Sequence, residues 1–488
     1  MLFNSFEFLL FFPIVTLIYF LLPHKFRWFH LLAASCIFYM AFVPVYILIL
    51  LVTIIIDYIA GIWIERSPMP RRKLFLVMSI VANVGFLCFF KYYNFFADNV
   101  NGLFHLTHLN AGIPLLHILL PIGLSFHTFQ AMSYTIEVYR GNQKAERHFG
   151  IYALYVMFYP QLVAGPIERP QNLLHQFHEP HYFSYDDCVH GLRQMMWGLF
   201  KKAVIADRLG LLVDQVYKDP AHSSGTALVL GTILFAFQIY CDFSGYSDLA
   251  LGAARVMGIG LMVNFNRPFN AKSMSEFWRK WHISLSTWLS DYIYTPLAVG
   301  LRNYGMYAVV LCALATFLIS GLWHGAAWKY IVWGGLHGVA IAYEVLTKKK
   351  RKKLFSHLPG WLGKLLSLFL TFSYICFTFI FFRARNIREA VLIIRKIPHL
   401  FTEWKQVLHN KQVLSTILFK GIRTPDIIIC ICLVLLLEVI HKLQGKGSVS
   451  DLIAARPTAV RWGIYFVLTL SIYMFGIFNN RQFIYFQF

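Results

Sequence analysis

The chain has 488 residues, of which 58% are hydrophobic and only 14% are charged. Soluble domains carry roughly 25% charged residues, so this composition excludes an ordinary soluble protein. The formal net charge is +21, but much of the positive charge lies in short clusters between apolar stretches, as at residues 348–353. Such clusters are typical of the cytoplasmic loops of membrane proteins, and they do not indicate a nucleic-acid partner.

Apolar stretches long enough to cross a lipid bilayer, about 20 residues each, recur along the whole chain. They are continuous rather than alternating, which favours helices over a β-barrel. We therefore expect an all-α polytopic membrane protein with roughly eleven transmembrane helices and additional re-entrant or interfacial helices. Outside the central stretch, the expected spans cover approximately residues 6–23, 29–43, 45–63, 74–96, 114–137, 224–257, 362–382, 425–441 and 462–479, with a less apolar loop near 98–112.

The positive-inside rule orients these spans. Lys25 and Arg27 follow the first span, which places its end in the cytoplasm and the N-terminus outside. By the same reasoning the C-terminus is also outside. The basic residues between Arg383 and Lys396 then fall on the outer side, which conflicts with the rule unless they belong to an amphipathic surface helix. The cysteines show no metal-binding spacing and are interpreted as free thiols, most of them in apolar stretches.

Three prolines interrupt the chain at Pro160, Pro166 and Pro170. Proline removes a backbone donor and breaks a helix interior, so this segment cannot be a straight span. It either lines a cavity at membrane depth or forms an elbow at the cytoplasmic surface. Glu168 and Arg169 lie within it and indicate contact with water.

Polar residues occur in two further regions. Residues 185–216 are amphipathic and mixed in charge, which favours helices that lie at the membrane interface. Asp242 and Asp248 interrupt the predicted span at 224–257. Acidic side chains at membrane depth are costly, and they usually face the interior of a helical bundle or an aqueous cavity.

The central stretch, residues 273–338, contains three histidines in apolar surroundings: His282, His324 and His337. Ser273 and Glu276 form an S-x-x-E pattern that predicts the start of a helix. The residues that follow predict one continuous helix with an aromatic stripe and a neighbouring polar seam. The polar seam comprises Arg279, His282, Ser286 and Ser290. It either carries part of a site or faces the lipid headgroups.

His324 stands between Gly321 and Gly325, small residues that allow close approach of another helix or of a substrate. A neutral imidazole in a dry site is a suitable general base for a hydroxyl, because its pKa lies near the working pH. The alternative is a structural histidine bonded across helices. His337 has a similar setting with less around it, and we assign it a structural role. No metal is expected, because His282 and His324 lack metal-ligand spacing.

The runs WRKWHISLSTWLSDYIYTPL and SGLWHG, each with one histidine, resemble motifs of the membrane-bound O-acyltransferase family. LVAGPIERP and the terminal NNRQFIYFQF are similar to its bacterial branch, which includes alginate, peptidoglycan and cellulose acetylation proteins and the teichoic-acid D-alanylation protein. The resemblance runs through nearly the whole chain. It implies a single membrane domain over 1–488, with N-terminal spans in 1–150, a catalytic core in 151–345, and C-terminal spans and a tail in 346–488.

The resemblance also implies a fold and a set of site residues. The family fold is a ring of spanning helices around a thin core, where a cytoplasmic and an outer funnel meet. The family's catalytic histidine matches His324, and its second polar residue matches His282. Tyr485 matches a suspected acyl relay, for which a terminal aromatic anchor at the membrane interface is the alternative. The residues expected to line the cavity are Trp281, Ser286, Trp323, Asp242, Glu168 and Arg169.

The implied function is transfer of an acetyl group from a cytoplasmic thioester across the inner membrane for O-acetylation of an exported or cell-wall polysaccharide. The donor would be acetyl-CoA or an acyl-carrier thioester, with no bound cofactor. A periplasmic SGNH-type acetyltransferase or another polysaccharide-modification subunit would complete delivery. Two alternatives are a transporter or flippase for a lipid-linked glycan and a non-catalytic scaffold for the periplasmic transferase. The few intramembrane acids, Asp57, Asp242 and Asp248, give the transporter little support.

Overall fold

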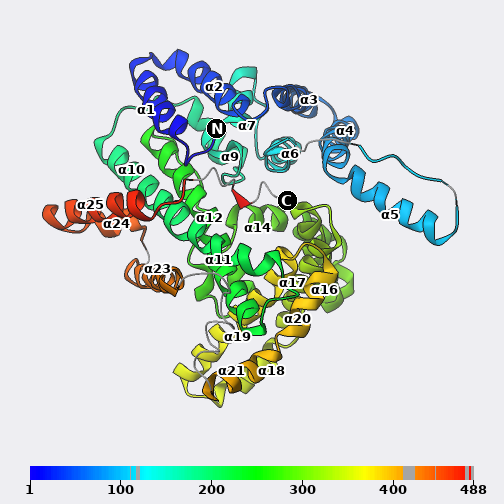
Figure 1. Ribbon diagram of the computed structural model, residues 1–488. Coiled ribbons are helices and arrows are strands. Elements are labelled where there is room, and N and C mark those ends of the chain that lie inside the picture. Colours follow the sequence, from blue (N-terminus) through cyan, green and yellow to red (C-terminus); the bar gives the residue numbers. More distant parts are fainter. Residues whose placement is uncertain (110, 117–120, 410–423, 446, 479–482, 485–488) are drawn as a thin grey trace. The chain divides into compact units, whose positions relative to one another are not determined.

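The computed structural model describes the whole chain except residues 110, 117–120, 410–423, 446, 479–482 and 485–488 (Figure 1). The described residues form helices and connecting segments, with no β-strand among them. They divide into two compact units. The first unit comprises residues 1–195 and 246–263, and the second comprises residues 196–245 and 264–488.

Helices α10 and α12 run from one unit into the other. The first unit contains α1 (Phe6–Leu21), α2 (His24–Met40), α3 (Tyr46–Arg66), α4 (Met69–Leu87), α5 (Tyr93–Leu106), α6 (Leu124–Arg140), α7 (Phe149–Met157), α8 (Tyr159–Leu162), α9 (Pro170–Leu173) and most of α10 (Tyr185–Leu199). The second contains the π-helical segment Phe200–Ala206, α11 (Asp207–Lys218), the first two thirds of α12 (Gly225–Val256), α13 (Met274–Trp278), α14 (Ile283–Leu289), α15 (Thr295–Gly300), α16 (Gly305–His324), α17 (Trp328–Leu346), α18 (Lys348–Ser356), α19 (Gly360–Arg383), α20 (Ile387–Lys396), α21 (His399–His409), α23 (Thr424–Leu443), α24 (Val449–Ala454) and α25 (Thr458–Phe475).

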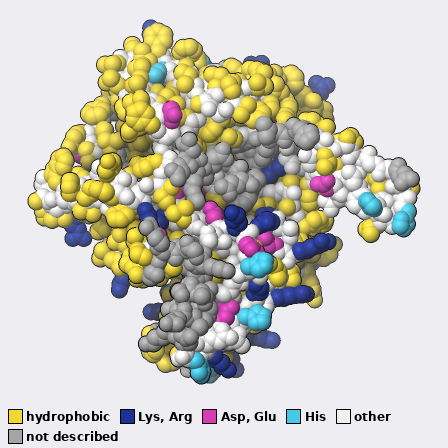
Figure 2. All heavy atoms as spheres, viewed as in Figure 1, with side chains coloured by type: hydrophobic (Ala, Val, Ile, Leu, Met, Phe, Trp, Pro, Cys, Tyr) yellow, Lys and Arg dark blue, Asp and Glu magenta, His cyan; other side chains and the backbone are white. Residues whose placement is uncertain are grey.

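The predicted all-helical membrane architecture is confirmed. Among the described residues, six helical stretches are long and apolar enough to cross a membrane, and α1 is a shorter apolar helix. The six are Tyr46–Arg66, Met69–Leu106, Gly225–Val256, Arg302–His324, Gly360–Arg383 and Thr458–Phe475. Large apolar side chains are exposed along them, and hydrophobic groups cover much of the face seen in Figure 2. The expected count of eleven spans stays a prediction.

A polar cluster joins the membrane helices of the first unit. Asp57 of α3 is fully buried, and its carboxylate accepts hydrogen bonds from Ser79 Oγ at 2.6 Å and from Asn83 Nδ2 at 2.8 Å. Both donors lie on α4. Gly61 of α3 allows the ring of Tyr134 on α6 to approach, since a Cβ there would lie 2.6 Å from that ring. Hydrogen bonding and close packing therefore hold α3, α4 and α6 together, which satisfies a carboxylate that lipid could not solvate.

Two expected boundaries in the first unit are wrong. The less apolar loop near 98–112 is helical as far as Leu106, because a π-helical turn lets α4 continue into α5. The span expected at 114–137 begins only at Leu124. The preceding residue, Gly123, adopts a left-handed conformation with φ 79°, and the helix starts directly after it.

Helices α16 and α17 make the closest helix pair of the second unit, side by side in Figure 1. A Cβ added at Gly321 would overlap the carbonyl oxygen of Tyr330, and one at Gly334 would overlap that of Phe317. Glycine at both positions lets the two backbones touch. This contact fixes the end of α16, where His324 lies, against the first turns of α17.

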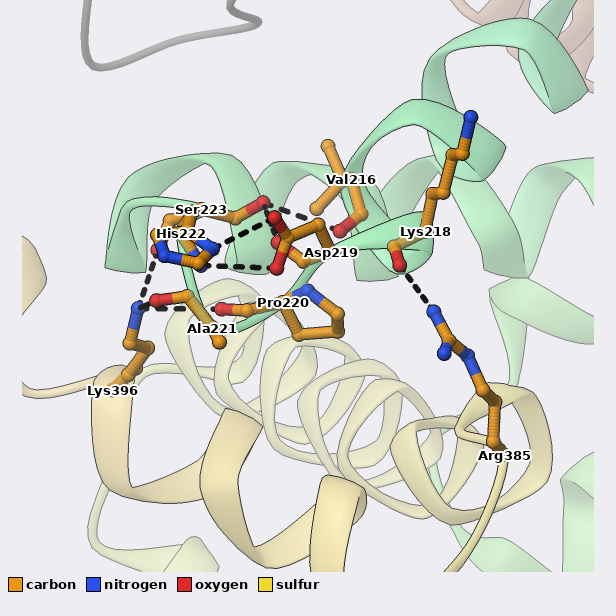
Figure 3. Close-up of polar contacts among 9 residues, drawn as sticks. All are labelled: Val216, Lys218, Asp219, Pro220, Ala221, His222, Ser223, Arg385 and Lys396. Atoms are coloured by element: carbon orange, nitrogen blue, oxygen red, sulfur yellow. Dashed lines mark hydrogen bonds and ion pairs between the residues drawn. The ribbon is translucent and has the colours of Figure 1, made fainter.

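The basic residues near α20 bind backbone carbonyls of the α11–α12 loop (Figure 3). Lys396 Nζ donates to the carbonyl oxygens of Pro220, at 3.2 Å, Ala221, and Ser223, at 2.9 Å. Arg385 donates to the carbonyl oxygen of Lys218. The expected amphipathic helix is present as α20, with Ala390 and Ile393 buried on one face. Contacts within the protein thus account for the positive charges of Arg385 and Lys396.

Candidate active site

His282 lies in a break between two short helices, not on a continuous helix. Helix α13 ends at Trp278 and α14 begins at Ile283, and His282 adopts a left-handed conformation with φ 43°. The expected polar seam is therefore wrong: His282 is fully buried, whereas Arg279 and Ser290 are exposed. A positive φ at a non-glycine residue costs about 1–3 kcal/mol and persists only where surrounding contacts impose it.

Asn264 supplies those contacts. Its carbonyl oxygen accepts from Ile283 N at 2.9 Å, and its side-chain Oδ1 accepts from Ser284 N at 3.2 Å and Ser284 Oγ at 2.9 Å. The same Oδ1 lies 3.2 Å from His282 Nδ1. Because the Ser284 amide can only donate, the Asn264 atom must be oxygen, so His282 Nδ1 carries the hydrogen. The lone pair of the neutral ring is therefore on Nε2.

Burial keeps His282 neutral. It lowers the pKa of His282 to about 3. The rings of Phe243 and Trp323 approach it edge-on, with centroids 4.7 Å and 6.1 Å away. At neutral pH this side chain can accept a hydrogen bond at Nε2 but cannot supply a positive charge.

His324 is the last residue of α16 and is 4% exposed. Its ring lies 4.9 Å from the rings of both Trp323 and Trp333, and 5.5 Å from Phe382. Trp323 contacts both His282 and His324, so the structure brings the two predicted histidines to one aromatic cluster.

His337 lies on α17 and contacts the same aromatic cluster through Trp333. Its ring centroid is 4.7 Å from Trp333 and 5.1 Å from Trp278. The side chain is fully buried, and neither ring nitrogen has a hydrogen-bond partner among the described residues. The structural role expected for His337 stays a prediction.

Two side chains cap the N-terminus of α13, and one of them, Glu344, comes from α17. Ser273 Oγ accepts from Glu276 N at 3.1 Å, as the S-x-x-E pattern predicted. The Glu276 carboxylate accepts from Lys272 N instead of completing a capping box. Glu344 of α17 completes the cap, since it accepts from the amides of Met274 and Ser275 at 2.6 and 3.0 Å.

The other expected lining residues are placed as follows. Trp281 is buried in the aromatic core and stacks on Phe277. Ser286 is half-buried and donates to the carbonyl oxygen of Trp281 at 3.1 Å. Asp242 is buried on α12 and pairs with Lys202 at 2.6 Å. Whether any of them touches a substrate stays a prediction.

Glu168 and Arg169 belong to the first unit. The expectation that Glu168 touches water is wrong, because its side chain is fully buried and accepts from Met262 N and Asn172 Nδ2, both at 2.5 Å. Burial raises the pKa of Glu168 to about 7, against the effect of these hydrogen bonds. Arg169 is half-buried. The broken proline segment is confirmed as non-spanning, with only short helices at Tyr159–Leu162 and Pro170–Leu173.

Tyr485 lies outside the described residues. Two residues that the motifs did not indicate contribute to the site: Asn264 orients His282, and Glu344 caps the helix before it. Asn264 stands in a short polar segment, and asparagine often bonds to nearby backbone, but no spacing rule connects it to His282.

Comparison with known proteins identifies the family of the chain. The family model described as "MBOAT, membrane-bound O-acyltransferase family" matches residues 148–384, which include both histidines. The peptidoglycan O-acetyltransferase of Helicobacter pylori is 31% identical, over 94% of this chain and 91% of its own length. The probable alginate O-acetylase AlgI of Pseudomonas aeruginosa is 36% identical, over 80% and 73%. The teichoic acid D-alanyltransferase of Streptococcus thermophilus is 29% identical, over 54% and 68%.

A helical membrane protein with two buried histidines in an aromatic cluster fits an enzyme that handles a small acyl group in a dry site. The chain belongs to the membrane-bound O-acyltransferase family. It is therefore an acyltransferase and a membrane protein, as its sequence predicted.

Proposed function

We propose that this acyltransferase takes an acetyl group from a cytoplasmic thioester and passes it across the bacterial inner membrane for O-acetylation of an exported or cell-wall polysaccharide. The observation that carries the proposal is the pair of buried histidines, His282 and His324, which both contact Trp323. The names of the relatives, a peptidoglycan O-acetyltransferase and a probable alginate O-acetylase, support an acetyl group and a polysaccharide.

The reaction replaces a thioester with an oxygen ester. The acceptor hydroxyl oxygen bonds to the carbonyl carbon, the carbon–sulfur bond breaks, and the thiol leaves with the proton. His324 takes the hydroxyl proton and returns it to the departing thiolate. His282 can only accept at Nε2, so it orients the acceptor through a different donor group, and the single proton of the reacting hydroxyl goes to His324. Because its Nδ1 hydrogen is held by Asn264, His282 is better suited to this positioning than to oxyanion stabilisation.

The donor is acetyl-CoA or an acyl-carrier thioester, both of which are anionic. Helix α18, with six consecutive basic residues, offers positive charge on the side that the positive-inside rule assigns to the cytoplasm. Such a cluster raises the local concentration of an anionic donor. A periplasmic SGNH-type acetyltransferase, or another polysaccharide-modification subunit, would receive the acetyl group on the other side.

Tyr485 is a candidate acyl relay on the outer side, and its Phe variant tests that role. Tyr485→Phe removes only the hydroxyl that would carry the acetyl group. Loss of acetyl export, with donor consumption retained, is the result expected of a relay. Full activity in Tyr485→Phe would leave the residue as an interfacial anchor.

Replacement of His324 tests the function as a whole. We expect His324→Ala to lower acetyl transfer from acetyl-CoA by about 10²–10⁴-fold, because the general base is lost. Purified protein in liposomes, assayed for acetyl labelling of an acceptor, measures this directly. A scaffold would support polymer acetylation in cells unchanged after the substitution. A glycan transporter would consume no acetyl-CoA in liposomes even with His324 present.

A further inference from the structure

The C-terminal residues Phe483 and Ile484 are buried in the second unit against helix α12. The amide of Ile484 donates to Asp242 Oδ2 at 2.8 Å. The ring of Phe483 lies 5.3 Å from that of Phe243. Two consecutive residues of α12 therefore hold the same segment, one by its backbone and the other by a side chain.

The chain is also hydrogen-bonded before it reaches Phe483. At the end of α25, the carbonyl oxygen of Phe475 accepts from Arg208 at 3.0 Å. The amide of Ile477 donates to the carbonyl oxygen of Ala203, also at 3.0 Å. Both partners lie in the helical stretch formed by the π-helical segment and α11. The end of α25 and the described residues Ile477 and Ile484 after it are thus each hydrogen-bonded within the second unit.

Asp242 makes a contact beyond the charge balance of its surroundings, where two buried lysines, Lys201 and Lys202, face two buried carboxylates, Asp207 and Asp242. Lys202 Nζ is bound by Asp207 at 2.9 Å as well as by Asp242 at 2.6 Å. Burial works to lower the pKa of Lys202, but the two carboxylates hold it above its usual value. The Asp242 carboxylate has one oxygen on Lys202 and the other on the Ile484 amide, so its additional contact is to the C-terminal segment.

This attachment lies next to the histidine site. The Phe243 ring that contacts Phe483 also approaches His282 edge-on, with centroids 4.7 Å apart. We propose that Asp242 is a positioning residue, which fastens the C-terminal segment at Phe483 and Ile484 to α12 beside His282. Its effect on acetyl transfer rests on the proposed function, whereas the attachment itself does not.

Carboxypeptidase digestion of the purified full-length protein in detergent tests the attachment, with intact mass as the readout. Asp242→Leu removes both acceptor oxygens and leaves Lys202 paired with Asp207. Ile484→Pro removes the amide donor and leaves Asp242 paired with Lys202. We expect Asp242→Leu to lose residues 484 and 483 about tenfold faster than the unmodified protein, since a buried hydrogen bond is broken. Ile484→Pro is compared by its transfer rate alone, because carboxypeptidases cleave poorly beside proline. The matched controls, Asp207→Asn and Ile484→Val, should be digested at the original rate.

The same variants are then assayed for acetyl transfer. The positioning role predicts about a tenfold lower transfer rate in Asp242→Leu and Ile484→Pro, with the KM for acetyl-CoA unchanged, because the segment does not bind the donor. Unchanged digestion in Asp242→Leu would overturn the attachment. Faster digestion with normal transfer would overturn the positioning role. If instead His324→Ala kept full transfer, the proposed function would fail, while the digestion result would stand.

Discussion

Asn264 illustrates how one polar residue can set the chemistry of a buried histidine. Its side-chain oxygen receives hydrogen bonds from Ser284 and from His282 Nδ1. This arrangement selects the ring tautomer and holds the unusual backbone conformation of His282. A neutral side chain suits this task better than a carboxylate, because a carboxylate would favour the charged imidazolium.

We expect Asn264→Ala to lower the rate of acetyl transfer by about 10²-fold, because His282 loses its orientation. Asn264→Asp is the variant to compare with Asn264→Ala, since the carboxylate keeps a hydrogen-bond acceptor but adds a negative charge. Its pH–rate profile should gain an acid-side inflection as the carboxylate raises the pKa of His282. Transfer rates measured between pH 5 and 9 make the comparison, and equal profiles for Asn264→Asp and the unmodified protein would contradict the assignment.

Glu168 is a second residue whose environment has a measurable consequence. Its pKa is raised from 4.5 to about 7 in the folded protein. Below pH 4.5 the carboxyl is protonated in both the folded and the unfolded chain. Between pH 4.5 and 7 only the folded state keeps the proton, so the free energy of unfolding falls as pH rises, by about 3 kcal/mol in total.

Thermal unfolding in detergent at pH 5 and pH 8 measures this effect. The unmodified protein should lose more stability between the two pH values than Glu168→Gln, which has no proton to release. An equal decrease in both proteins would show that Glu168 does not titrate in this range.

At the scale of elements, the close contact between α16 and α17 holds His324 next to Trp333. Gly334→Ala would place a methyl group against the carbonyl oxygen of Phe317 and within 3.1 Å of Gly321. Moving the helices apart displaces His324 relative to Trp333. We expect a destabilisation of about 1–3 kcal/mol and a large loss of acetyl transfer.

Gly335→Ala is the matched control on the same helix. Its added Cβ would meet only Leu318 Cδ2, at an ordinary 3.6 Å. Alanine there should leave the unfolding temperature unchanged or raise it slightly, because glycine weakens a helix interior. Unfolding temperature and transfer rate are measured for both variants, and similar behaviour of the two would argue against a special contact at Gly334.

For the whole molecule, orientation in the membrane is the main prediction. Eleven complete crossings would place the two ends of the chain on opposite sides. The expected outer location of both ends therefore requires an even number of complete crossings. The basic helix α18 should face the cytoplasm.

Cysteine labelling in whole cells tests this orientation. In a variant without the eight native cysteines, a cysteine at Asn4 should react with a membrane-impermeant maleimide, and one at Lys350 should react only after lysis. A cysteine added after Phe488 should behave like the one at Asn4. The reverse pattern at Lys350 would invert the topology and remove the basis for a cytoplasmic donor at α18.

Local chemistry along the chain was sufficient to predict the helical membrane class, the broken proline segment, the helix start at Ser273 and the apolar surroundings of His282 and His324. Hydropathy, proline and capping all act within a few residues, so they can be recognised without the fold. Tertiary structure alone decided the helix break at His282, its tautomer, the burial of Glu168 and the attachment of Ile484 to Asp242. Those features depend on partners up to 242 positions away in the chain, which meet only when the helices pack.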